Sequence, residues 1–153
     1  MSVYIPPSAY VGAILGNVAH RATATVAADQ DLFSTSGAVL LTGLLGRVTT
    51  AIGAGSQDLE IDFDPDDGGA NVALSTLVLV DAAPTGTLFH LNATAGGALV
   101  NALDVAYNGI LAAPIVLGQA GDIVLDVTGT EAGSVEWWAW WLPIDDGASL
   151  VAT

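Results

Sequence analysis

Carboxylates are the most abundant groups that could do chemistry in this 153-residue chain. They crowd most densely just before Gly68, where acidic residues are interrupted by Phe63 and Pro65. Oxygen ligands at alternate positions near a turn suit Ca²⁺. The stretch departs from an EF-hand loop because Gly arrives one place late, Pro interrupts it, and position twelve is Ala73. We interpret the stretch as the solvent-exposed face of a strand that continues into an acidic turn. The alternative is a Ca²⁺ or Na⁺ site made of Asp62, Asp64, Asp66 and Asp67.

Groups for acid–base or nucleophilic catalysis are scarce. His20 and His90 are the two histidines, and the chain has neither Cys nor Lys. These absences exclude a P-loop, a thiolate zinc site and a Cys nucleophile, and no Gly-x-Ser-x-Gly motif is present. A pair of carboxylates will lie close together in almost any fold with 16 acidic residues, so proximity alone does not indicate a glycosidase. We therefore predict that the protein is not an enzyme.

Four tryptophans fall within five residues near the C-terminus. In a strand, Trp137 and Trp141 would point to one face, and Trp138 and Trp140 to the other. Burying four indoles is worth about 20 kcal/mol of gross transfer free energy, so they are rarely left wet. We predict one pair in the core and the other against a second layer or subunit. The alternative is a platform on which Trp138 and Trp140 stack against sugars, with Glu136 as a polar partner.

The net charge of −14 sets 16 acidic residues against Arg21 and Arg47. Direct binding to phosphate backbones is excluded, because nucleic acids attract basic surfaces. A surface of carboxylates without Lys repels itself unless salt shortens the Debye length to about 3 Å at about 1 M. A halophilic habitat is therefore one hypothesis, and ordinary acidity of viral or secreted proteins is the other.

The elements that position these groups are predicted to be strands, because no apolar stripe of helical period persists for three turns. Gln57 to Asp64 alternates apolar and acidic residues, and Asn71 to Val80 follows as an apolar strand that completes a hairpin. The spacing predicts one all-β domain over residues 21–153, an antiparallel sandwich or jelly-roll-like barrel. The other predicted strands are Arg21–Val26, Ala38–Leu45, Arg47–Ile52, Thr87–Asn92, Ala98–Val105, Ile110–Leu117, Asp122–Thr128 and Ser134–Leu142, with a hairpin turn at Asn108-Gly109.

Residues 1–20 are predicted to form an extended N-terminal arm, apolar and poor in strand patterns from Tyr10 to Val18. No apolar run reaches the roughly 18 residues that span a bilayer, and no signal peptide is visible. The arm must be covered by its own barrel or by a neighbouring subunit. The predicted subunit interface comprises Tyr4, Ile5, Tyr10, Ile14, Leu15, Trp137, Trp138, Trp140 and Trp141.

Three segments together resemble small structural proteins of tailed bacteriophages and archaeal tailed viruses. They are Leu-Phe-Ser-Thr-Ser-Gly at 32–37, a Gly-Arg-Val-Thr strand within 44–52, and the aromatic strand that runs into Pro143 and Gly147-Ala148. The resemblance covers residues 23–153 and implies a β-sandwich or barrel virion protein, in particular a capsid decoration or turret protein. Four Trp in the closing strand exceed what that family leads us to expect.

The resemblance and the excess of apolar surface together predict a homotrimer or homopentamer that sits on the major capsid protein at the virion surface, without a cofactor, membrane or nucleic-acid partner. A tail-associated structural protein and a module that binds glycans on a host surface are the alternatives.

Overall fold

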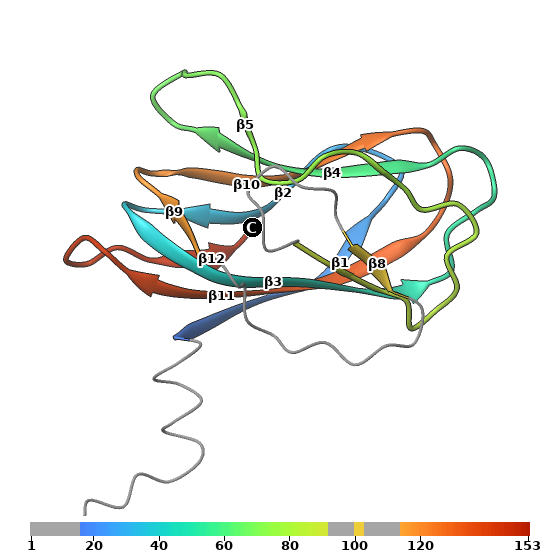
Figure 1. Cartoon of the computed structure of the whole chain (residues 1–153), viewed down its shortest axis with the longest axis horizontal. Coiled ribbons are helices and arrows are strands. Elements are labelled where there is room, and N and C mark those ends of the chain that lie inside the picture. Colours follow the sequence, from blue (N-terminus) through green and yellow to red (C-terminus); the bar gives the residue numbers. More distant parts are fainter. Residues whose placement is uncertain (1–15, 92–99, 103–113) are drawn as a thin grey trace, which may run out of the picture.

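The protein is described by a computed structural model over residues 16–91, 100–102 and 114–153. Every regular element in those ranges is a β-strand. The strands form two antiparallel sheets that pack face to face as a β-sandwich (Figure 1). The predicted all-β sandwich is therefore confirmed.

Sheet A has the strand order β1-β11-β3-β7-β8, and β9 also pairs with β3. The order places β11 between β1 and β3, so the aromatic strand is central and not at an edge. The strands are β1 (Asn17–Thr25), β3 (Val39–Thr50), β7 (Leu88–His90), β8 (Val100–Ala102), β9 (Ile115–Leu117) and β11 (Ser134–Pro143).

Sheet B has the strand order β12-β2-β10-β4-β5, and β6 also pairs with β4. The chain crosses between the sheets after β1, β2, β3, β6, β9, β10 and β11, and the jelly-roll form stays a prediction. The strands are β2 (Gln30–Thr35), β4 (Asp58–Pro65), β5 (Val72–Ala73), β6 (Val78–Leu79), β10 (Gly121–Thr128) and β12 (Leu150–Ala152).

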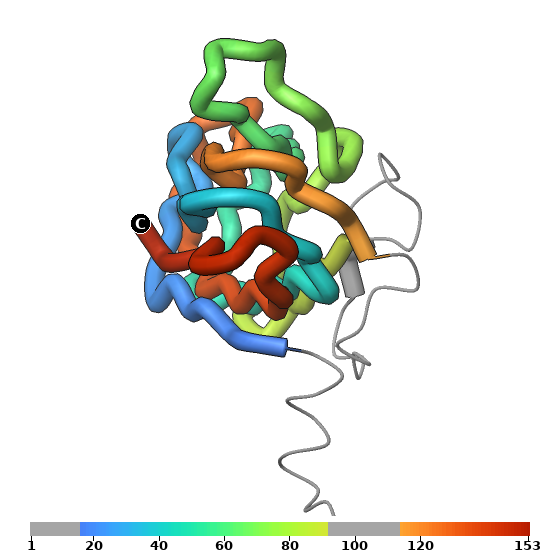
Figure 2. The backbone as a smooth tube through the Cα atoms, turned by 90° about the vertical axis from the view of Figure 1, so that its left-hand side faces the viewer, coloured from blue at the N-terminus to red at the C-terminus, as the bar shows by residue number. Residues whose placement is uncertain are grey.

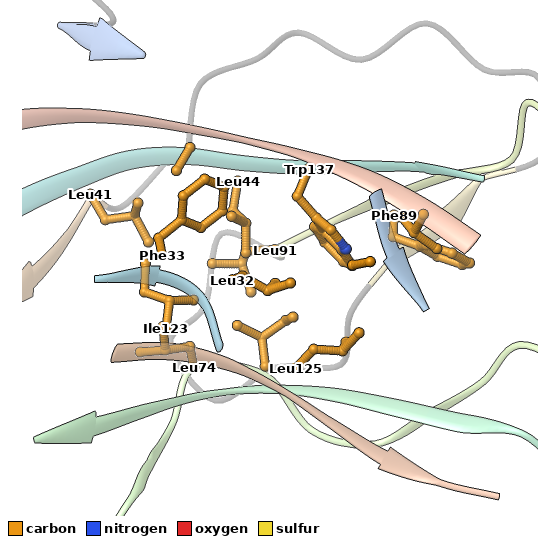
Figure 3. Packing of buried hydrophobic residues seen from close by; sticks show 14 of the residues in the cluster. Leu32, Phe33, Leu41, Leu44, Leu74, Phe89, Leu91, Ile123, Leu125 and Trp137 are labelled. Atoms are coloured by element: carbon orange, nitrogen blue, oxygen red, sulfur yellow. The ribbon is translucent and has the colours of Figure 1, made fainter. Parts of the chain in front are cut away.

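The core lies between the sheets and is built mainly by the inward residues of β2, β3, β4, β10 and β11 (Figure 3). Trp137 is completely buried there, beside Phe89, with ring centroids 6.5 Å apart. Its indole lies over Gly46 of the neighbouring strand, where a Cβ atom would stand only 2.7 Å from the ring. Glycine at this position therefore makes room for the largest side chain of the core.

Strand β3 is one strand of twelve residues, so the prediction of two strands with a break at Gly46 was wrong. The register against β11 slips between Trp140 and Trp141, which pair with Gly43 and Leu41. This β-bulge shifts the inward positions of β3 by one residue. Leu41 and Leu44 both point into the core as a result.

Other predicted boundaries also change. Strand β1 begins at Asn17, so residues 17–20 belong to the sandwich and not to the arm, because Ala19 packs inward. The predicted strand Asn71–Val80 is reduced to β5 and β6 with a turn between them, although the hairpin with β4 is confirmed. Strands β2 and β12 were not predicted. Residues 1–15 and the predicted turn at Asn108-Gly109 lie outside the described residues.

Strands β1 and β12 lie side by side at one edge of the sandwich (Figure 2), and Arg21 links the two sheets there. Its guanidinium donates to Thr153 Oγ1 at 3.3 Å and to Gln30 Oε1 at 3.2 Å. These two acceptors lie beyond the end of β12 and on β2, so one side chain ties sheet A to sheet B.

Candidate interaction surface

Strand β11 divides its four tryptophans between its two faces as predicted. Trp137 and Trp141 are 0% and 8% exposed, and both belong to the core. Trp138 and Trp140 point outward and are partly exposed. The prediction that all four indoles contact another subunit is therefore corrected for Trp137 and Trp141, because both are buried in the core of their own chain.

Glu136 is the one carboxylate in the described strands of sheet A, and it is almost buried on the outer face. Arg47, opposite on β3, donates its Nε–H to Glu136 Oε1 at 2.5 Å and completes an ion pair through its second nitrogen. His20 Nε2 lies 3.5 Å from the other carboxylate oxygen. Both oxygens of Glu136 therefore have a basic neighbour, which offsets the cost of removing the charge from water.

Trp138 lies between the same two basic side chains. The His20 ring stacks on the indole with centroids 4.9 Å apart and planes 15° from parallel. The Arg47 guanidinium carbon lies 5.5 Å from the centroid of the Trp138 ring. Because β1 and β3 flank β11 on opposite sides, His20 and Arg47 approach the indole from opposite sides. A pyranose needs a free aromatic face, so this arrangement counts against Trp138 as a sugar platform.

We call the outer surface of sheet A around these residues the aromatic face. One row of it crosses four strands from His20 through Trp138 and Leu45 to His90. The next row holds Val18, which is 58% exposed, opposite Trp140. All basic residues of the chain lie in strands of sheet A. Glu136, the one acidic residue in the described strands of that sheet, is paired with Arg47. Within the described strands of sheet A, the aromatic face therefore carries no uncompensated negative charge.

The outer surface of sheet B, which we call the carboxylate face, has the opposite chemistry. Asp64 lies directly opposite Asp122, and Glu60 opposite Asp126. Like charges in facing positions destabilise a sheet. The acidic residues of this face are Asp31, Asp58, Glu60, Asp62, Asp64, Asp122 and Asp126.

The crowding perturbs two of these groups. Burial raises the pKa of Glu60 above its usual value, and the charges of Asp62 and Asp126 raise it further. Burial likewise raises the pKa of Asp62, with Asp126 adding to the effect. Both carboxyl groups therefore hold a proton more tightly in the folded chain than in the unfolded chain.

The residues of the predicted cation site are not gathered. Asp62 and Asp64 lie along the outer face of β4, whereas Asp66 and Asp67 lie in the turn beyond Pro65. Asp67 Oδ1 accepts a hydrogen bond from the Gly69 backbone N–H at 2.9 Å, as in an Asx turn. Within the described ranges, no three His, Cys, Asp or Glu side chains are grouped so that they could hold a metal ion.

A groove of about 300 Å³ lies at one edge of the sandwich. The end of β4 and strand β5 form one side of it, and β9 forms the other. One wall comes from Phe63, Val72 and Leu74, and the other from Ile115, Val116 and Leu117, with Pro65, Gly118 and Gln119 completing the lining. Val72 and Val116 are 55% and 61% exposed. The described lining of the groove is therefore mostly apolar, with Gln119 as a polar residue and no charged side chain.

The sequence prediction of an interface is only partly covered by the structure. Tyr4, Ile5, Tyr10, Ile14 and Leu15 lie outside the described residues. The predicted interface did not include His20 and Arg47, which flank Trp138. It did not include the residues of the groove either. The signal for Arg47 was its rarity as one of two Arg, but nothing in the sequence indicated that it pairs with Glu136 across 89 positions.

Comparisons with protein-family models, with curated proteins and with solved structures found no match. The described residues include no helix with the length and apolar character needed to cross a membrane.

Proposed function

We propose that this chain is a non-enzymatic structural protein of a tailed virus, which forms a homotrimer or homopentamer and decorates the outside of the capsid. The observation that carries the proposal is the aromatic face. Partly exposed Trp138 and Trp140 lie there on a sheet without uncompensated carboxylates, in a chain whose net charge is −14. Interfaces between proteins are enriched in aromatic residues and Arg and depleted in acidic residues.

The rest of the molecule supports the same role. The carboxylate face would keep the outside of an assembly soluble and repel other copies. The sequence resemblance over residues 23–153 adds the virion setting. A decoration protein works by burial, because it binds the assembled shell more tightly than the separate subunits and so stabilises the shell by mass action.

The oligomer is tested by sedimentation velocity of the full-length protein over a wide concentration range. We expect an assembled species, and a Trp138→Ala/Trp140→Ala variant that sediments as a monomer while its circular dichroism stays that of a β-protein. The matched control is Val151→Ala, since Val151 is exposed on β12 of sheet B and not on the sheet that carries the aromatic face. A wild-type chain that stays monomeric at every concentration contradicts the proposal.

The virion setting is tested by immunogold electron microscopy of virus particles from the source organism. Label over the capsid supports decoration. Label confined to the tail favours the tail-associated alternative, and unlabelled particles contradict a virion role.

Glycan binding is the second candidate, and Trp140 is the residue that supports it. Trp140 is partly exposed, and no ring contact to it is found among the described residues. A glycan array compares the wild-type chain with Trp140→Ala. Binding that the substitution abolishes, in a chain that stays monomeric, would replace the proposed function with this one.

A further inference from the structure

The molecule has two apolar surfaces that face different directions, and this limits how copies can associate. The aromatic face lies on the outer side of sheet A, whereas the groove is lined by residues of β9, β4 and β5. Figure 1 shows where these strands lie in the sandwich. A twofold dimer needs only one patch, because the same surface serves both copies. A closed ring of three or more copies needs two different patches on each subunit, which is what this chain offers.

The two surfaces also match in shape and chemistry. Trp140 is a partly exposed indole on the aromatic face, without a ring contact in the described part of the chain. The groove has a volume of about 300 Å³ and apolar walls, so it can receive an aromatic side chain. Aromatic anchors seated in apolar pockets are the usual energetic centres of protein interfaces. Packing the aromatic face against a copy of itself would leave the groove empty.

The negative charge of sheet B disfavours contacts between copies through the carboxylate face. The carboxylate face repels a second copy of itself, and it offers neither an apolar hole for Trp140 nor a cation for Glu136. Neither the groove lining nor the exposed row of Val18 and Trp140 contains a charged side chain. These are the surfaces on which two copies can approach without burying a carboxylate.

We propose that the groove between β5 and β9 receives Trp140 of a second copy of this chain, so that the oligomer is a ring of head-to-tail contacts. The inference rests on the proposed oligomeric function and adds the partner surface to it. Each copy gives its aromatic face to one neighbour and its groove to the other. Because the contact joins the outer side of one copy to the edge of the next, each copy is rotated relative to its neighbour. A constant rotation of this kind allows the ring to close.

The test mixes two variants that damage opposite ends of the contact. Trp140→Ala removes the anchor and keeps the groove, whereas Val116→Asp charges the groove and keeps the anchor. Each variant alone should sediment as a monomer at concentrations where the wild type is fully assembled. Their equimolar mixture should form a 1:1 heterodimer, because one intact anchor still meets one intact groove, and it should stop there.

The control is Val151→Asp, which places the same charge at a similarly exposed valine that belongs neither to the groove lining nor to sheet A, and it should assemble like the wild type. If Val116→Asp loses its β circular dichroism, Val72→Asp on the opposite wall replaces it. Normal assembly of the folded groove variant overturns the inference while the oligomer stands, and so does a mixture of two monomeric variants that forms no complex. A monomeric wild type overturns the proposed function itself.

Discussion

The two sheets share one core but expose opposite surfaces, and the difference arises from what each strand places at its outward positions. Sheet B alternates core residues with carboxylates along β4 and β10, so its outer face faces water and repels anions. Sheet A places indoles and basic groups at those positions and neutralises its one carboxylate, Glu136. Outward positions cost little in folding, so they are free to serve solubility on one side and association on the other.

The largest expected difference in stability is between a tryptophan on the core face of β11 and one on its outer face. Trp137→Ala should lower the free energy of unfolding by about 3–5 kcal/mol, because it opens a large cavity in a fully buried site. Trp138→Ala should cost only about 1–2 kcal/mol, since it removes stacking and cation–π contacts at the surface. Urea unfolding monitored by circular dichroism measures both. Equal losses would contradict the division of the strand into a core face and an outer face.

An intermediate effect is expected from breaking the ion pair on the aromatic face. Arg47→Met should cost about 1–3 kcal/mol, because it leaves the nearly buried Glu136 carboxylate without its strongest partner. Adding Glu136→Gln should recover much of that loss, since the remaining charge is removed. The double-mutant cycle is measured by urea unfolding. Additive losses in the double variant would show that the two side chains do not interact.

The smallest effect concerns the carboxylate face and its dependence on pH. Because the pKa values of Glu60 and Asp62 are raised in the folded chain, the folded state binds protons more tightly than the unfolded state. These two groups should therefore stabilise the fold as pH falls from neutrality through their raised pKa values, and this gain is lost as pH rises again. Thermal unfolding at a series of pH values between 7 and about 4.5 measures it.

The matched variant for that series is Glu60→Gln/Asp62→Asn, which should be more stable than the wild type at pH 7 and flatter across the series. Molar NaCl should narrow the difference between the two proteins at neutral pH, because it shortens the Debye length to about 3 Å. Thermal midpoints that do not change with salt would rule out the halophilic hypothesis.

The all-β class of the fold and the two faces of its long strands can be predicted from residue patterns alone. Alternation of period two decided which side of Gln57–Asp64 and which tryptophans of β11 point inward, since that pattern needs only a single strand. It failed where the period is broken. The bulge beside Trp140 joins two predicted strands into β3, and short edge strands such as β5 and β12 carry too few residues to show a period.

Which residues contact each other across strands depends on how the sheets are assembled. Arg47 pairs with Glu136 because β3 lies beside β11, His20 stacks on Trp138 because β1 lies on the other side, and the groove exists because β5 and β9 end the two sheets at the same edge. These contacts join positions that are far apart in the chain. Strand order sets them, and local patterns in a single sequence carry no record of strand order.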